Sequence, residues 1–224
     1  MKKIGIVGRV YYNKDNQEII QLNDYLRRVL VSYEDVIPIL LLPLDNISYN
    51  AVKDDKIDGK RLNYLLDMCD AFIVPGGTNW YNFDEYVIRY ATLKKKPLLA
   101  ICLGFQCLCS MYSEYRNKKD MTKRLTSNSH YGLFNEYRHS VKIEDNTKLK
   151  SILNKDYIMV NSLHYDYIDI PLKELIVSSY SDDNIIEAVE LKGHPFFIGL
   201  QWHPEYLDDD NSKKIFDSFI NSIK

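Results

Sequence analysis

The chain has 224 residues, 46% of them hydrophobic, which is enough to bury a full core, and we expect a single domain over residues 1–224. Its 29 lysines and arginines nearly balance its 31 aspartates and glutamates, which argues against a nucleic-acid partner and favours a small molecule. The apolar run from Ile4 to Val7 is far too short for a signal peptide or a membrane span, so we expect a cytoplasmic protein with no membrane contact. Composition predicts nothing about the oligomeric state.

Four cysteines occur at positions 69, 102, 107 and 109, without paired CxxC motifs or any spacing typical of zinc. We therefore expect free thiols, as in a reducing compartment. We also expect no metal and no organic cofactor.

In chain order, the first half alternates between strand-like and helix-like segments. Residues 3–8 predict a strand, residues 19–33 a helix with apolar side chains at helical spacing, and residues 37–42 a strand covered on both faces. A helix over 62–68, a strand over 71–74, a helix over 84–93 and a strand over 98–101 follow. This order predicts an α/β fold with a doubly wound, mostly parallel central sheet flanked by helices.

The pattern changes after Ser110. Residues 113–130 are polar and charged without a clear period, which predicts a long surface excursion, either a lid or a disordered loop. Strand-like segments then occur at 140–143, 157–161, 185–190 and 196–201, and an amphipathic helix is predicted over 211–223.

Residues 97–106, PLLAICLGFQ, are the most informative stretch. A short apolar run stops at Cys102, and Gly104 precedes a helix-compatible segment, which predicts a strand, a sharp turn and a helix. A thiol at this turn lies at the carboxyl end of a strand and beside the positive end of a helix dipole, so it is suited to act as a thiolate nucleophile. Taken alone, a buried structural cysteine is the commoner alternative.

Two further motifs bear on Cys102. Gly76 and Gly77 follow a predicted strand, where backbone N–H groups can approach an oxyanion closely, although an ordinary turn is the alternative. His203 and Glu205 lie two residues apart and, if the preceding strand continues, project to the same side. A carboxylate there can fix the tautomer of a histidine that takes the thiol proton, whereas a lone His-Pro-Glu is more often a surface turn.

A third motif, VNSLH, spans residues 160–164 at the end of a predicted strand. Asn161, Ser162 and His164 could hydrogen-bond a substrate there, or each could cap a local turn.

Together, PGG at 75–77, CLGFQ at 102–106, VNSLH at 160–164, IEAVE at 186–190 and GLQWHPE at 199–205 resemble the class I glutamine amidotransferase-like superfamily. Within it, the chain is most similar to the γ-glutamyl hydrolases, which cleave a γ-glutamyl amide bond and release glutamate. The resemblance implies that Cys102 is the nucleophile, His203 the general base and then acid, and Glu205 the orienting carboxylate.

The resemblance also implies a set of binding residues. The backbone N–H groups of Leu103 and of Gly76 or Gly77 would form the oxyanion hole. The γ-glutamyl pocket would be lined by Gln106 and His164, with Asn161 and Ser162 as further candidates, and Arg9 would bind a substrate carboxylate.

The chain departs from the family pattern around the pocket. Ala100 stands where the family usually has glycine, Leu103 stands where many members have arginine, and the connection from the PGG loop to Asp84 is short. The short loop and the composition look similar to hydrolases that act on γ-glutamyl-CDP-amidate in capsule biosynthesis. A diphosphate needs cationic donors, which Arg116, Lys118, Lys119, Lys123 and Arg124 would supply if they do not form a merely solvated loop.

Two other functions fit the same motifs. The chain could be a glutaminase subunit that delivers ammonia to a synthetase partner, or a non-catalytic binding protein of the same fold. The complete set of Cys102, His203 and Glu205 argues against the non-catalytic alternative.

Overall fold

A computed structural model describes residues 1–44, 59–113, 122–125, 130–170 and 172–224, with the backbone alone described for 122–124. Within these residues, no helix has both the length and the apolar character needed to cross a membrane.

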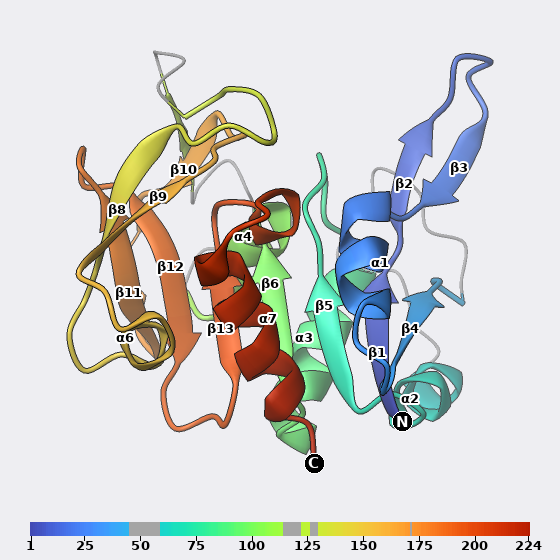
Figure 1. Ribbon diagram of the computed structural model, residues 1–224. Helices are drawn as coiled ribbons and strands as arrows, with labels where there is room; N and C mark the ends of the chain where they lie inside the picture. Colours follow the sequence, from blue (N-terminus) through green and yellow to red (C-terminus); the bar gives the residue numbers. More distant parts are fainter. Residues whose placement is uncertain (45–58, 114–121, 126–129, 171) are drawn as a thin grey trace.

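Among the described residues, a nine-stranded sheet forms the centre of the fold (Figure 1). In spatial order its strands are β4 (Val36–Leu41), β1 (Lys2–Val7), β5 (Ala71–Val74), β6 (Leu98–Ile101), β13 (Phe197–Leu200), β12 (Ile186–Leu191), β11 (Leu175–Ser181), β8 (His139–Ile143) and β9 (Tyr157–Val160). Neighbours from β4 to β13 run parallel, and neighbours from β13 to β9 run antiparallel.

Helices cover both faces of this sheet, which confirms the predicted α/β class. They are α1 (Asp24–Val31), α2 (Gly59–Asp67), α3 (Asn82–Lys94), α4 (Leu103–Met111), α6 (Lys148–Leu153) and α7 (Asp210–Asn221). Apolar side chains of α1, α6 and α7 form one core with the sheet, and those of α2, α3 and α4 form the other. In Figure 1, α1 and α7 lie in front of the sheet and α3 lies behind it.

The two central strands show why short apolar runs form strands here. In β5, Ala71 and Ile73 belong to one core, while Phe72 and Val74 belong to the other. Successive side chains of a strand point to opposite faces, so a strand covered on both faces must be apolar at every position. The predicted bounds 71–74 and 98–101 match β5 and β6.

The predicted helix over 19–33 is partly wrong. Residues Glu18–Gln21 form strand β3, which pairs with β2 (Arg9–Tyr12) as a hairpin that extends away from the main sheet. The helix begins at Asp24 because Asn23 caps it: its side chain accepts a hydrogen bond from the Tyr25 N–H. The predicted helix began too early because the helical spacing of the apolar residues after this cap was extended to the residues before it.

The strand predicted over 37–42 is confirmed as β4, but the expectation that both its faces are covered is wrong. Because β4 is the edge strand next to β1, Ile37 and Leu40 are each 40% exposed. The predicted excursion over 113–130 lies mostly outside the described residues. Its described part includes β7 (Thr122–Arg124), which pairs with β10 (Asp166–Ile168).

The first turn of α4 lies directly against β5 at Gly104. A Cβ atom added to Gly104 would lie 2.0 Å from the carbonyl oxygen of Val74, a backbone atom that cannot move aside cheaply. We expect Gly104→Ala to lower the free energy of unfolding by about 3 kcal/mol or more, measured by urea denaturation.

Gly132→Ala is the matched control for this substitution. Its added Cβ would lie 3.3 Å from Cδ of Arg138, a flexible side chain that can shift, so we expect a change below about 1 kcal/mol. Equal stability of the two alanine variants would contradict the tight contact at Gly104.

Candidate active site

Three neighbouring parallel strands bring the predicted motifs to one edge of the sheet. Strands β5, β6 and β13 lie side by side, and they end just before the PGG loop, Cys102 and the segment that carries His203. Because parallel strands end at the same edge, segments far apart in sequence meet there.

Cys102 lies at the sharp turn between β6 and α4, so the predicted strand, turn and helix are confirmed. Its backbone has φ 51° and ψ −103°, a strained conformation for a residue with a side chain. The Cys102 N–H donates to the Leu200 carbonyl at 2.7 Å, and its own carbonyl accepts from the Gln106 N–H at 3.1 Å. The thiol therefore lies at the N-terminus of α4, where the helix dipole favours negative charge.

His203 and Glu205 are in contact, as predicted, but not through strand geometry. Strand β13 ends at Leu200, and the contact is made by the short 3₁₀ helix η1 (Pro204–Tyr206). The His203 Nδ1 lies 2.7 Å from a Glu205 carboxylate oxygen. A carboxylate only accepts, so Nδ1 carries the hydrogen and Nε2 is left for the opposite side of the ring.

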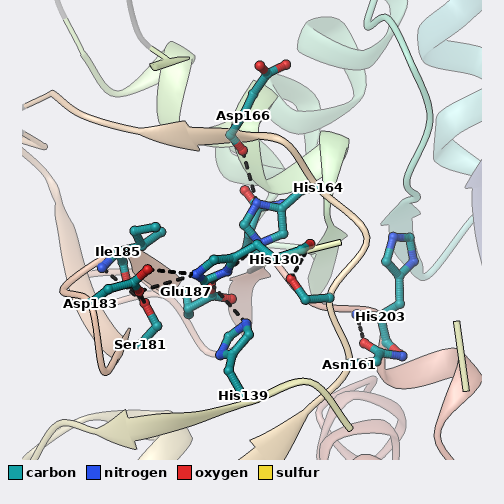
Figure 2. Close-up of polar contacts among 12 residues, drawn as sticks. His130, His139, Asn161, His164, Asp166, Ser181, Asp183, Ile185, Glu187 and His203 are labelled. Carbon is teal, nitrogen blue, oxygen red and sulfur yellow. Dashed lines mark hydrogen bonds and ion pairs between the residues drawn. The ribbon is translucent and has the colours of Figure 1, made fainter. Parts of the chain in front are cut away.

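Asn161 fixes the backbone of His203. Its Oδ1 accepts from the His203 N–H, and its Nδ2 donates to the His203 carbonyl, both at 2.9 Å (Figure 2). A third bond runs from Nδ2 to the Phe134 carbonyl at 2.7 Å. The side chain thus positions the segment that carries the imidazole.

The imidazole, the PGG loop and the cysteine meet closely. A Cβ added to Gly76 would lie 2.6 Å from Cε1 of His203 and 3.4 Å from Cβ of Cys102, so glycine permits this approach. Burial lowers the pKa of His203, but the charges and hydrogen bonds of its neighbours Glu205 and Cys102 outweigh it and raise the pKa to about 10. The ring is therefore a stable cation at neutral pH.

This raised pKa has a consequence for stability. The pKa of His203 rises from about 6.5 to about 10 on folding, so its charge stabilises the protein fully below about pH 6.5, and that contribution is lost as the pH rises through 10. We expect the free energy of unfolding, measured by denaturant titration, to fall over this interval. The fall should be smaller in His203→Gln, and an identical pH dependence in both proteins would contradict the assignment.

Arg9 lies in β2 and binds the backbone of the PGG loop. Its guanidinium donates to the carbonyls of Pro75, at 3.2 Å, and Gly76, at 3.1 Å, and forms a buried ion pair with Asp84 of α3. This charge was predicted to bind a substrate carboxylate, whereas in the structure it is compensated by Asp84. The interaction holds the loop in place beside His203.

The other predicted binding residues hydrogen-bond within the chain. Gln106 donates to the Asp166 carbonyl at 3.0 Å and to the Gln201 side chain at 3.1 Å. Ser162 donates to the His130 carbonyl at 2.6 Å, and His164 lies 3.1 Å from the Asp166 carbonyl. The structure thus brings the glycines, Cys102, His203 and Glu205 together, while these side chains contact the segments around residues 130 and 166.

A cavity of about 140 Å³ lies beside His203, between the PGG loop, the β2–β3 hairpin and η1. Tyr11, Asn23 and Tyr206 line it, and none of them was predicted as a site residue. The ring of Tyr206 packs on that of His203 with centroids 5.0 Å apart, and its hydroxyl contacts Asn23. Burial, reinforced by the Glu205 charge, raises the pKa of Tyr206 to about 12, so the Tyr206 hydroxyl is neutral at physiological pH. The position of Tyr206 directly after Glu205 is the sequence signal by which it could have been predicted as a site residue.

A family model described as peptidase C26 matches residues 81–205, which are more than half of the chain and include Cys102, His203 and Glu205. The chain belongs to the peptidase C26 family. A glutamine amidotransferase-like protein of Rickettsia prowazekii is 26% identical, covering 73% of this chain and 80% of the relative.

A CTP synthase of Prochlorococcus marinus is 25% identical over 92% of this chain. The chain spans only 40% of the length of that enzyme. Among solved structures, the glutaminase domain of Trypanosoma brucei CTP synthase with bound acivicin has a TM-score of 0.71 and 17% identity, covering 100% of this chain and 94% of that domain. This peptidase C26 member therefore has the class I glutamine amidotransferase fold.

Proposed function

We propose that this peptidase C26 member hydrolyses a γ-glutamyl amide bond through a covalent Cys102 intermediate. The observation that carries the proposal is the cationic His203, bonded to Glu205 and adjacent to a cysteine held at positive φ. A cation next to a thiol at a helix N-terminus favours the thiolate, which is the nucleophilic form.

In the first half of the reaction, the Cys102 thiolate attacks the γ-carbonyl carbon and the carbonyl oxygen becomes an oxyanion. Leu103 is the first residue of α4, so its N–H makes no hydrogen bond within the helix and can donate to the oxyanion together with that of Gly76 or Gly77. The carbon–nitrogen bond then breaks, the leaving nitrogen takes the proton of His203, and a γ-glutamyl thioester remains.

In the second half, neutral His203 takes a proton from water as the water oxygen attacks the thioester. The tetrahedral intermediate expels the Cys102 thiolate and releases glutamate, and His203 is again a cation. Glu205 keeps the hydrogen on Nδ1 throughout, so that Nε2 exchanges the proton. None of these steps requires a cofactor.

An electrophilic glutamine analogue tests this chemistry directly. We expect acivicin to label Cys102 alone, located by mass spectrometry of peptides. The other thiols are internal controls, since burial raises the pKa of Cys69 to about 11 and holds those of Cys107 and Cys109 well above the usual value. Failure to label Cys102 would favour a non-catalytic binding protein.

For the leaving group, we propose an anionic nucleotide, with γ-glutamyl-CDP-amidate giving glutamate and cytidine diphosphoramidate. The support is the short PGG connection and the basic residues between 116 and 124, whose side chains lie outside the described residues. Neutralising Lys118, Lys119, Lys123 and Arg124 together should lower kcat/KM for this substrate far more than for glutamine. Equal losses, or a wild-type preference for the uncharged amide, would leave a general γ-glutamyl hydrolase.

A glutaminase that delivers ammonia to a synthetase partner is a second candidate, favoured by the similarity to CTP synthases. Incubating the isolated chain with glutamine alone and assaying ammonia separates the two. Rapid unaided turnover of a γ-glutamyl amide supports the free-standing hydrolase. Slow turnover of every such amide, with Cys102 still labelled by acivicin, supports the glutaminase subunit.

A further inference from the structure

A second cluster of titratable side chains lies to the left of His203 and Asn161 in Figure 2 and takes no part in the proposed reaction. It consists of His130, His139 on β8, His164 and Glu187 on β12, and one ligand atom from each lies within 4.8 Å of the others. The side chains are almost fully buried, with Glu187 0% and His139, the most accessible, 13% exposed.

In each of the three histidines, the ring nitrogen that points away from the cluster, here called the outer nitrogen, faces an oxygen acceptor. The other ring nitrogen, the inner one, points toward Glu187. Nδ1 of His164 lies 3.1 Å from the Asp166 carbonyl, and Nδ1 of His139 lies 3.2 Å from the Ser140 carbonyl. Nε2 of His130 lies 3.2 Å from both carboxylate oxygens of Asp183. These oxygens only accept, so the outer nitrogens carry hydrogens, and in the neutral form of each ring the inner nitrogen presents a lone pair. Histidines that bind metals are oriented in this way.

The distances among the inner atoms of His130, His164 and Glu187 are close to the edges of a metal tetrahedron, and His139 completes a group in which every pair of atoms lies within 4.8 Å. Nδ1 of His130 lies 3.3 Å from Nε2 of His164, and a Glu187 oxygen lies 3.2, 3.5 and 3.7 Å from the inner nitrogens of His130, His164 and His139. A charged N–H···O hydrogen bond is about 2.7–2.9 Å long. By contrast, zinc–nitrogen bonds of about 2.0–2.1 Å place tetrahedral ligands about 3.3 Å apart.

Glu187 provides an independent observation. Within the described part of the chain, neither of its buried carboxylate oxygens meets hydrogen-bond geometry with a donor, and the same holds for Nε2 of His139. A buried carboxylate facing three lone pairs is costly unless a cation compensates it.

We infer that His130, His139, His164 and Glu187 bind one divalent transition-metal ion of the zinc class. Three nitrogens and one oxygen suit zinc better than calcium or magnesium, which prefer oxygen ligands, and four protein ligands are typical of a structural site. The carboxylates of Glu187 and Asp183 together balance the two charges of the ion.

The metal would stabilise the neighbouring active site without being part of it. His164 lies in the same short segment as Asn161, which holds the His203 backbone, and the Glu187 carbonyl accepts from the Gln201 N–H at 2.7 Å. An ion that ties β8, β12 and this segment together would fix Asn161 without contacting the substrate.

The first test uses the wild-type chain. After dialysis against a chelator, Co²⁺ should bind at one equivalent per chain and give the visible absorption of a tetrahedral site, and Zn²⁺ should abolish that absorption at one equivalent. Binding below a tenth of an equivalent would overturn the inference. That result is expected if His130 instead holds a proton that it shares with Glu187.

The second test compares neighbouring carboxylates. Asp182 and Asp183 are both exposed, but the contact with His130 is made by Asp183. In competition with a chromogenic chelator, Asp183→Asn should weaken Zn²⁺ binding by about 10- to 100-fold, while Asp182→Asn should not change it. Equal affinities of the two variants would overturn the proposed site.

The third test removes a ligand. His139→Gln should lose the cobalt absorption, while His194→Gln, which changes a buried histidine outside the cluster, should keep it. Retention of the absorption by His139→Gln would also overturn the site. The wild-type titration and the aspartate pair keep the inference testable even if His139→Gln fails to fold.

Discussion

Replacing Cys102 by alanine should lower kcat for γ-glutamyl amide hydrolysis by about 10⁴-fold or more while leaving the protein folded. The thioester cannot form without this thiol, and the neighbouring thiol of Cys107 points into a core formed with α3. The measurement is single-turnover release of glutamate, with circular dichroism to establish folding.

Cys107→Ala is the matched control, because it removes a thiol from the same helix without touching the turn. We expect it to keep turnover within about tenfold of wild type, with some loss of stability from the small cavity. A Cys102→Ala protein that retains more than about a tenth of wild-type turnover would remove the proposed mechanism.

His203→Ala should also lower turnover by about 10⁴-fold or more, and Glu205→Gln should cost one to two orders of magnitude less. The imidazole transfers the proton in both halves of the reaction, whereas the carboxylate orients the ring and supports its charge. Steady-state kcat for both variants, on the same γ-glutamyl amide, gives the ranking.

Asp208→Asn serves as the control for the loss of a carboxylate, since Asp208 is exposed just beyond η1. Its turnover should equal that of wild type. A larger loss in Glu205→Gln than in His203→Ala would mean that the roles of the two residues are assigned wrongly.

The elements predicted best are those whose sequence pattern has one physical cause. Strands β5 and β6 are buried on both faces, so an uninterrupted apolar run defines their bounds. The β2–β3 hairpin was missed because Ile19 and Ile20 are exposed side chains on a projecting ribbon. Such a strand lacks the alternation of apolar and polar residues that burial of one face produces. Strand β11, which was also not predicted, pairs with β12 through an irregular register.

The candidate site was predictable where its parts are adjacent in sequence. His203 and Glu205 meet within one turn of chain, and the turn at Cys102 follows from the strand that precedes it. Contacts between distant segments leave no such signal. Arg9 meets Asp84 across 75 residues, and His164, predicted to line the substrate pocket, lies instead against Glu187. Local sequence patterns do not carry pairings of this kind, which arise from the order of strands in the sheet.

At Cys102, the requirements of stability and of chemistry conflict. A side chain at φ 51° costs of order 1–3 kcal/mol, and glycine in its place would relieve that cost. If selection acted on stability alone, it would therefore favour the loss of this cysteine, and only a demand for turnover would act against the substitution. In a lineage freed from that demand, position 102 should change before His203 and Glu205. The contact between these two residues helps to hold the turn at η1 in place.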